Sequence, residues 1–165
     1  MQIVYRQGDV IDADEPVLVH GCNALGEMGS GVALQVRKRL YFAYAAYRQH
    51  YLLHGLRLGE VIWGIDVRHG ERPRLVGNAI TQQGYGSGPT QYVSYDAVRM
   101  VMQHIDVLLA NAADCLRIAA MPKLDAVAMP MIGAGRGGGR WEDIATIIEA
   151  ESQHFQPVVY RRLAD

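Results

Sequence analysis

The chain has 165 residues, 50% of them apolar and 20% charged, and this length suits a single globular domain spanning residues 1–165. Its net charge of -1 argues against binding to bulk nucleic acid or an anionic membrane, and no apolar run approaches the roughly 18 residues of a membrane span. Two cysteines and the lack of a signal-peptide pattern predict a reduced, cytoplasmic setting.

The pattern of apolar residues predicts strands that alternate with helices. Strands are expected at residues 2–6, 17–21, 61–67, 75–81, 126–132 and 157–160, and helices at residues 32–51, 92–113 and 141–152. Such alternation is typical of a three-layer α/β/α domain. Because several connections are too short for a crossover helix, including the polar loop at residues 68–74, we expect a mixed central sheet of about six strands.

Two glycine-rich loops, at residues 21–31 and 133–139, each follow a predicted strand and precede a predicted helix. Glycine lets the backbone approach a ligand closely, and a helix N-terminus presents free N–H groups to an anion. In an open α/β sheet both loops lie at the carboxyl ends of the strands, where ligands bind. The pair therefore predicts a cradle for a phosphate or diphosphate, with ordinary structural turns as the alternative.

The familiar nucleotide motifs do not explain these loops. Gly133, Gly135 and Gly138 match G-x-G-x-x-G, but no acidic residue ends a following strand, as a dinucleotide-binding fold requires. No G-K-[ST] sequence exists, which excludes a Walker A loop. Cys22 lacks an arginine six residues later, where Met28 stands, so a cysteine-dependent phosphatase is not supported. Cys22 and Cys115 are therefore interpreted as small buried apolar residues.

Seven short stretches, in the same order along the chain, resemble the macrodomain family. They lie at residues 8–10, 20–23, 29–33, 129–130, 133–135, 141–142 and 158–160. The resemblance implies a macrodomain-like α/β/α fold that binds ADP-ribose. It is closest to the branch that contains the yeast ADP-ribose-1″-phosphate phosphatase and the terminal ADP-ribose glycohydrolases.

The chain departs from the glycohydrolases of that branch at both of their catalytic positions. Gln82 and Gln83 follow the strand end where those enzymes use a lysine, and Arg136 and Gly137 stand where they use an aspartate. The only lysines are Lys38 and Lys123, neither near the matching loop. The resemblance therefore favours the phosphatase.

The resemblance also implies roles for individual residues. Asp9 would accept a hydrogen bond from the adenine amino group, unless it is only a turn or cap residue, and Asn23 would hold the distal ribose. Independently of the resemblance, His20 ends a predicted strand beside the ligand loop and could protonate the leaving oxygen or orient water, unless it is a core histidine. Glu27 is a second acid or base candidate, unless it is only a solvated loop residue. The expected ligand-binding set is Asp9, Val10, Gly29, Ser30, Gly31, Val32, Gly133, Ala134, Gly135, Arg136, Gly137, Gly138 and Tyr160, and the catalytic set is His20, Asn23 and Glu27.

We therefore expect a phosphatase that converts ADP-ribose-1″-phosphate to ADP-ribose and phosphate, with Arg136 near the terminal phosphate. A non-catalytic binder of ADP-ribose-type nucleotides remains an alternative, as does a hydrolase that removes ADP-ribose from macromolecules without a catalytic lysine. No metal or cofactor is expected, because His50 and His54 lack the glutamate of a zinc-binding H-E-x-x-H motif. The loop at residues 84–89 could close over a ligand or be an ordinary surface loop. The sequence predicts no oligomeric state.

Overall fold

The computed structural model describes residues 1–66, 74–118 and 124–162, and its central sheet has six strands. In chain order these are β1 (Val4–Gln7), β2 (Val17–Asn23), β3 (Val61–Asp66), β4 (Arg74–Gln82), β5 (Ala126–Pro130) and β6 (Gln156–Arg161). Their order in space is β1-β6-β5-β2-β4-β3. Neighbouring strands run parallel, except for the antiparallel pair of β3 and β4. The predicted mixed sheet of about six strands is confirmed.

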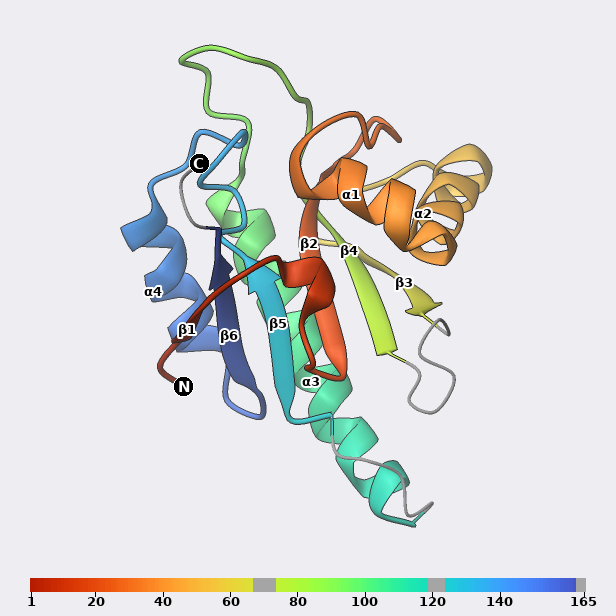
Figure 1. Ribbon diagram of the computed structural model, residues 1–165, viewed down its shortest axis with the longest axis vertical. Helices are drawn as coiled ribbons and strands as arrows, with labels where there is room; N and C mark the ends of the chain where they lie inside the picture. The colour runs from red at the N-terminus through yellow and green to blue at the C-terminus, as the bar shows by residue number, and fades with distance from the viewer. Residues whose placement is uncertain (67–73, 119–123, 163–165) are drawn as a thin grey trace.

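Helices cover both faces of this sheet, which confirms the three-layer prediction (Figure 1). The helices α1 (Gly31–Arg39) and α2 (Tyr41–His54) lie on one face, while α3 (Tyr95–Ile118) and α4 (Trp141–Glu151) lie on the other. Alternate residues of β2 build two separate cores: Leu18 packs with the α1–α2 layer, and Val19 packs with the α3–α4 layer. Among the described helices, none is long and apolar enough to cross a membrane.

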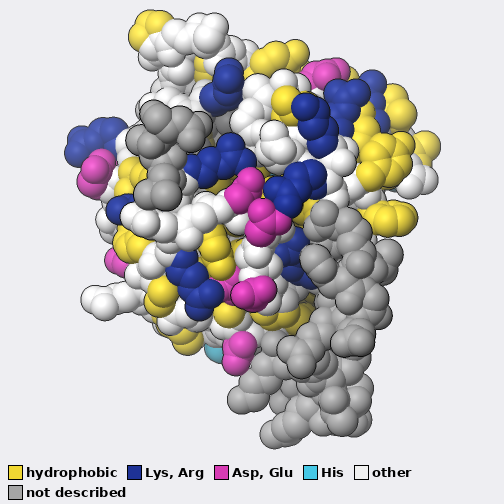
Figure 2. Space-filling model, in the orientation of Figure 1, with side chains coloured by type: hydrophobic (Ala, Val, Ile, Leu, Met, Phe, Trp, Pro, Cys, Tyr) yellow, Lys and Arg dark blue, Asp and Glu magenta, His cyan; other side chains and the backbone are white. Residues whose placement is uncertain are grey.

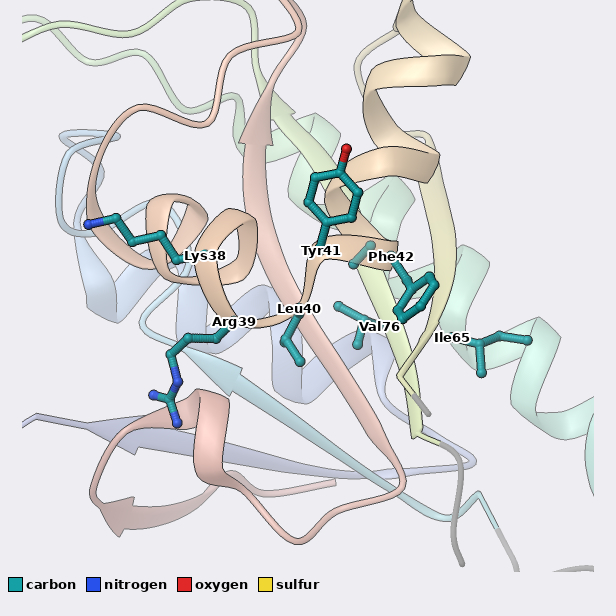
Figure 3. A pocket seen from close by; sticks show the side chains of 8 residues that line it. Lys38, Arg39, Leu40, Tyr41, Phe42, Ile65 and Val76 are labelled. Atoms are coloured by element: carbon teal, nitrogen blue, oxygen red, sulfur yellow. The ribbon is translucent and has the colours of Figure 1, made fainter. Parts of the chain in front are cut away.

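The single helix expected at residues 32–51 is wrong, because two helices meet at Leu40. This residue has a non-helical backbone, with φ of -126° and ψ of 54°, and its side chain is buried near Val76 (Figure 3). Because the chain changes direction at Leu40, the backbone of α2 packs directly against β3. The contact is so close that a Cβ atom added at Gly64 would lie 2.7 Å from the Cα atom of Ala43. Burial of Leu40 and this close contact explain the break, although no glycine or proline marks it.

Arg74, expected in a polar loop, is instead a buried residue that begins β4. Its guanidinium donates hydrogen bonds to the carbonyl oxygens of Ala13 and Ile11. These bonds tie the sheet to the short 3-10 helix η1 (Val10–Asp12), which the sequence did not predict. The rest of the expected loop (residues 68–73), Lys123 and the side chain of Cys115 lie outside the described residues.

The topology brings three connections to one edge of the sheet. Because β2, β4 and β5 run parallel, their carboxyl ends lie at the same edge. The first glycine loop leaves β2 and the second leaves β5, as predicted, and residues 83–91 leave β4, which neighbours β2 on the side away from β5 (Figure 1). This edge therefore holds the candidate site.

Candidate functional site

A cavity of about 550 Å³ opens at this edge of the sheet, and three segments form its walls. The first wall contains residues of the first glycine loop and the start of α1, namely Gly21, Cys22, Asn23, Glu27, Gly29, Ser30, Gly31, Val32 and Ala33. The second contains Pro130, Met131, Ile132, Gly133, Gly135, Arg136 and Gly137. The third contains Gln82, Tyr85, Gly86 and Ser87. A cavity of this size suits a small organic ligand.

Asn23 organises the first wall from within. Its side-chain oxygen accepts hydrogen bonds from the backbone N–H groups of Leu25 (3.0 Å) and Glu27 (3.3 Å), and its amide donates to the Glu27 carbonyl oxygen at 2.7 Å. The hydroxyl of Tyr47, on α2, donates to the backbone oxygen of Asn23 at 2.8 Å. Asn23 thus holds the loop in shape as well as lining the cavity, so its removal would disturb both.

Glu27 is the only carboxylate among the described residues that line the cavity, and its side chain is about half exposed (49%). The nearest cation is Arg48 of α2, with 3.7 Å between its Nη1 atom and the Glu27 Oε1 atom. Arg48 also donates to the Gly26 carbonyl oxygen at 3.0 Å and lies over the ring of Tyr51. Helix α2 therefore supports the position of the one acidic group in the cavity.

The second wall is a tight turn stabilised by its own backbone. The N–H group of Gly139 donates to the Gly133 oxygen at 2.9 Å, and the backbone at Gly133 has a φ of 74°. A side chain at Gly137 would lie 2.6 Å from that same oxygen, so only glycine fits there. The N–H groups of Gly135, Arg136 and Gly137 have no acceptor among the described residues. Free N–H donors at a cavity wall favour an anionic ligand.

The first wall offers similar donors at the start of α1. Ser30 precedes this helix but forms no capping hydrogen bond with its side chain, and Gly31, Val32 and Ala33 line the cavity. The first N–H groups of a helix need acceptors from outside it and carry the positive end of its dipole. Arg136 lies across from Gly31, since a Cβ atom added at Gly31 would be 3.9 Å from the Arg136 Cδ atom. Both walls and one cation therefore favour negative charge in the cavity.

The expected placement of His20 beside the ligand is wrong. Its side chain is completely buried and shares a face of β2 with Leu18, and its Nε2 atom donates to the Asn78 side-chain oxygen at 2.8 Å. Burial lowers the pKa of His20 to about 4, although the Asn78 hydrogen bond opposes this shift. The imidazole is thus a neutral core group, which is the alternative that the sequence left open.

The expected adenine end lies outside the cavity lining. Asp9 caps η1, accepting from the Ile11 N–H group at 3.0 Å, and it pairs with Arg162 at 2.8 Å and Arg39 at 3.5 Å. Lysine and arginine side chains alternate with acidic ones on this face (Figure 2). Val10 is buried, and the Tyr160 hydroxyl donates to Glu15. Ala134 and Gly138, predicted in the second loop, do not line the cavity either.

The sequence prediction omitted the third wall from the site. Gln82 pairs with Asn23 in the sheet register, and Tyr85, Gly86 and Ser87 follow on the segment that leaves β4. Its signal is a third glycine-containing loop after a strand, for which the sequence predicts either closure over a ligand or an ordinary surface loop. Cys22 is 3% exposed and burial raises the pKa of its thiol, which agrees with its interpretation as a buried apolar residue. Within the described ranges no cluster of metal-binding side chains occurs.

Two kinds of curated relative match most of the chain, whereas no family model matches it. The chain is 29% identical over 160 residues to a DNA ADP-ribosyl glycohydrolase of Mycobacterium tuberculosis and to one of Mycobacterium bovis. This match covers 94% of the chain but only 40% of the length of those relatives. An ADP-ribose 1″-phosphate phosphatase of Candida albicans is 25% identical, with 95% of this chain and 99% of the relative covered.

Solved structures match the whole fold. A Bacteroides thetaiotaomicron protein of unknown function has a TM-score of 0.78 and 29% identity, with 99% of both chains covered. A macrodomain protein from Streptomyces coelicolor has a TM-score of 0.69 and 25% identity, covering 97% of this chain and 99% of that one. DarTG of Thermosipho africanus, solved with ADP-ribose, shares the fold with a TM-score of 0.74 at 15% identity. The match covers 99% of this chain and 43% of that one. The predicted resemblance to the macrodomain family is confirmed, because the chain is similar in sequence and fold to its members.

Proposed function

We propose that this chain binds ADP-ribose and hydrolyses ADP-ribose-1″-phosphate to ADP-ribose and phosphate. The observation that supports it most is the pair of glycine-containing walls with free N–H donors on opposite sides of one cavity. A diphosphate between two sugars presents oxygens to both sides at once, which suits such a cradle. The solved complex of the Thermosipho DarTG with ADP-ribose shares this fold and supports the same ligand.

In the proposed arrangement the diphosphate lies between the start of α1 and the second wall. The distal ribose lies toward Asn23 and Glu27, and the adenine points toward Asp9. The helix α1, nine residues and therefore about 13 Å long, separates these two ends, because Arg39 at its last turn contacts Asp9. That span is compatible with a nucleotide extended along the helix.

The phosphatase assignment rests on which charged groups the cavity contains. The lining residues include one cation, Arg136, and one carboxylate, Glu27, and no lysine among those described. Arg136 would neutralise the terminal phosphate as charge develops on it. Glu27 would take a proton from the attacking water and return it to the ribose oxygen as the phosphorus–oxygen bond breaks. Gln82, at the lysine position of the glycohydrolases, could not supply their chemistry.

The Candida phosphatase supports this activity, because the match covers nearly the full length of both proteins. The mycobacterial glycohydrolases, at 29% identity, favour a second candidate: removal of ADP-ribose from DNA. Because no lysine occurs among the described residues of the cavity, that reaction would use Glu27 or the substrate itself. A non-catalytic binder of ADP-ribose is the third possibility.

One set of assays separates these functions. The parent protein is tested for phosphate release from ADP-ribose-1″-phosphate, for ADP-ribose release from ADP-ribosylated DNA, and for ADP-ribose binding by calorimetry. We expect phosphate release, and we expect Glu27→Gln to reduce its rate by about 10²–10⁴-fold while retaining ADP-ribose affinity. Glu142→Gln, an exposed change on α4 outside the cavity, is the control. Release from DNA alone would replace the phosphatase with the glycohydrolase, and binding without turnover would replace it with the binder.

A further inference from the structure

The third wall carries an aromatic side chain at the mouth of the cavity. Tyr85 lines the cavity, yet 55% of its surface is exposed. It is the only aromatic residue among the described residues of the three walls. We propose that the Tyr85 ring packs over the distal ribose of the bound nucleotide and that it distinguishes ADP-ribose from ADP. This inference rests on the proposed ADP-ribose site.

The base of the third wall is fixed to both glycine loops. On one side, the Ala24 N–H group donates to the Gln82 carbonyl oxygen at 2.9 Å, which joins the wall to the first loop. On the other side, the N–H groups of Tyr92 and Val93 both donate to the Gly137 oxygen, at 2.8 and 3.0 Å. The segment between these anchors arches beyond the end of β4 and returns beside the second loop (Figure 1). The segment that carries Tyr85 thus runs from the first glycine loop to the second.

The anchors also place Tyr85 at the sugar end. Gln82 pairs with Asn23 in the sheet register, and its side-chain amide donates to the Gly84 carbonyl oxygen at 2.7 Å. Tyr85 therefore lies three residues after Gln82, the sheet partner of Asn23, which is the residue proposed to hold the distal ribose. Asp9, the proposed adenine contact, caps η1 and pairs with Arg39 at the opposite end of α1.

The chemistry of the segment favours packing over charge. Residues 83–91 contain no charged side chain, so this wall cannot recognise a phosphate by an ion pair. Among the described residues, the Tyr85 hydroxyl has no hydrogen-bond partner and the ring has no aromatic neighbour in contact. An aromatic face offers a large, stiff surface for the carbon–hydrogen face of a sugar. Covering this half-exposed ring with the ribose would remove apolar area of both partners from water.

The test compares two ligands that differ by the distal ribose. ADP-ribose and ADP are titrated by calorimetry into the parent protein and into Tyr85→Ala, Tyr85→Phe and Tyr41→Ala. Tyr41 is the matched control because it is also exposed (63%) but lies on α2, away from the cavity walls. We expect Tyr85→Ala to weaken ADP-ribose binding about three- to tenfold and to change ADP binding by less than about twofold. Tyr85→Phe and Tyr41→Ala should match the parent for both ligands.

Thermal unfolding of each variant establishes that it folds. Unchanged ADP-ribose affinity in Tyr85→Ala overturns the inference and leaves the proposed function standing. Equal weakening of ADP and ADP-ribose also overturns it, because Tyr85 would not then read the ribose. A loss in Tyr85→Phe as large as in Tyr85→Ala refutes packing by the ring. If the parent binds neither ligand, the proposed function itself has failed.

Discussion

Two glycines of the second loop should separate stability from ligand binding. Gly135 and Gly137 both line the cavity, but they differ in what a side chain would meet. A carbon added at Gly137 would lie 2.6 Å from the Gly133 oxygen and 2.9 Å from its Cα atom, both backbone atoms. A carbon added at Gly135 would meet nothing within 4 Å. Gly137→Ala therefore disturbs the loop itself, whereas Gly135→Ala only narrows the space offered to a ligand.

The size of both effects follows from these distances. Ordinary carbon–oxygen contacts are more than half an ångström longer than 2.6 Å, so the turn must shift in Gly137→Ala. Overpacking of this kind costs about 1–3 kcal/mol, which lowers the melting temperature of a chain of this length by roughly 2–12 °C. Gly135→Ala should change the melting temperature by less than about 2 °C. If the diphosphate lies against the second wall, the added methyl group should still weaken ADP-ribose binding by about tenfold or more.

The assay is thermal unfolding and calorimetric titration of the same preparations. Gly84→Ala is the control, because its added carbon makes only ordinary contact with Tyr92 at 3.8 Å and Gly84 does not line the cavity. It should match the parent in both measurements. Full ADP-ribose affinity in Gly135→Ala would refute the placement of the diphosphate, and an unchanged melting temperature in Gly137→Ala would refute the steric reasoning.

Two further predictions concern pH. Burial raises the pKa of Asp106, but hydrogen bonds from His154 and Gln153 bring it below the ordinary value, so this carboxylate stabilises the fold at neutral pH and loses that effect as pH falls through its lowered pKa. Asp106→Asn should lower the free energy of unfolding by about 1.5–3 kcal/mol at pH 7 and by less as pH falls through the lowered pKa in urea titrations; a loss that does not change with pH would contradict this. Since burial lowers the pKa of His20 to about 4 from 6.5, the parent should lose stability as pH falls between these values, by up to about 1.4 kcal/mol per pH unit. His20→Gln should remove that part of the slope, and identical slopes in the two proteins would argue against a buried neutral imidazole.

The sequence predicted the elements whose signals are local. Six apolar runs became six strands, and both glycine loops took their expected place at the carboxyl ends of β2 and β5. The predicted helix from residue 92 begins at Tyr95, and the predicted strand to residue 132 ends at Pro130. Such boundaries depend on hydrogen bonds at the ends of elements, which periodicity does not determine.

Features that depend on distant partners were missed. Leu40 breaks a helical pattern because the close contact with Gly64 redirects α2, and Arg74 is buried because distant carbonyl groups accept its hydrogen bonds. His20 follows strand alternation, which puts it on the same face as Leu18, but only the sheet order shows that helices cover that face. The third wall was missed for the same reason, since the register of β2 with β4 brings Gln82 beside Asn23.

The most direct test of the account is calorimetric titration of the parent protein with ADP-ribose and, in parallel, with ATP and magnesium. A cradle with N–H donors on two sides and one arginine fits a diphosphate between two sugars, whereas a magnesium triphosphate would meet only one carboxylate, Glu27, among the described residues of the cavity. We predict a single saturable ADP-ribose site and much weaker ATP binding. Equal affinity for the two nucleotides, or no heat with ADP-ribose, would contradict the assignment of this cavity.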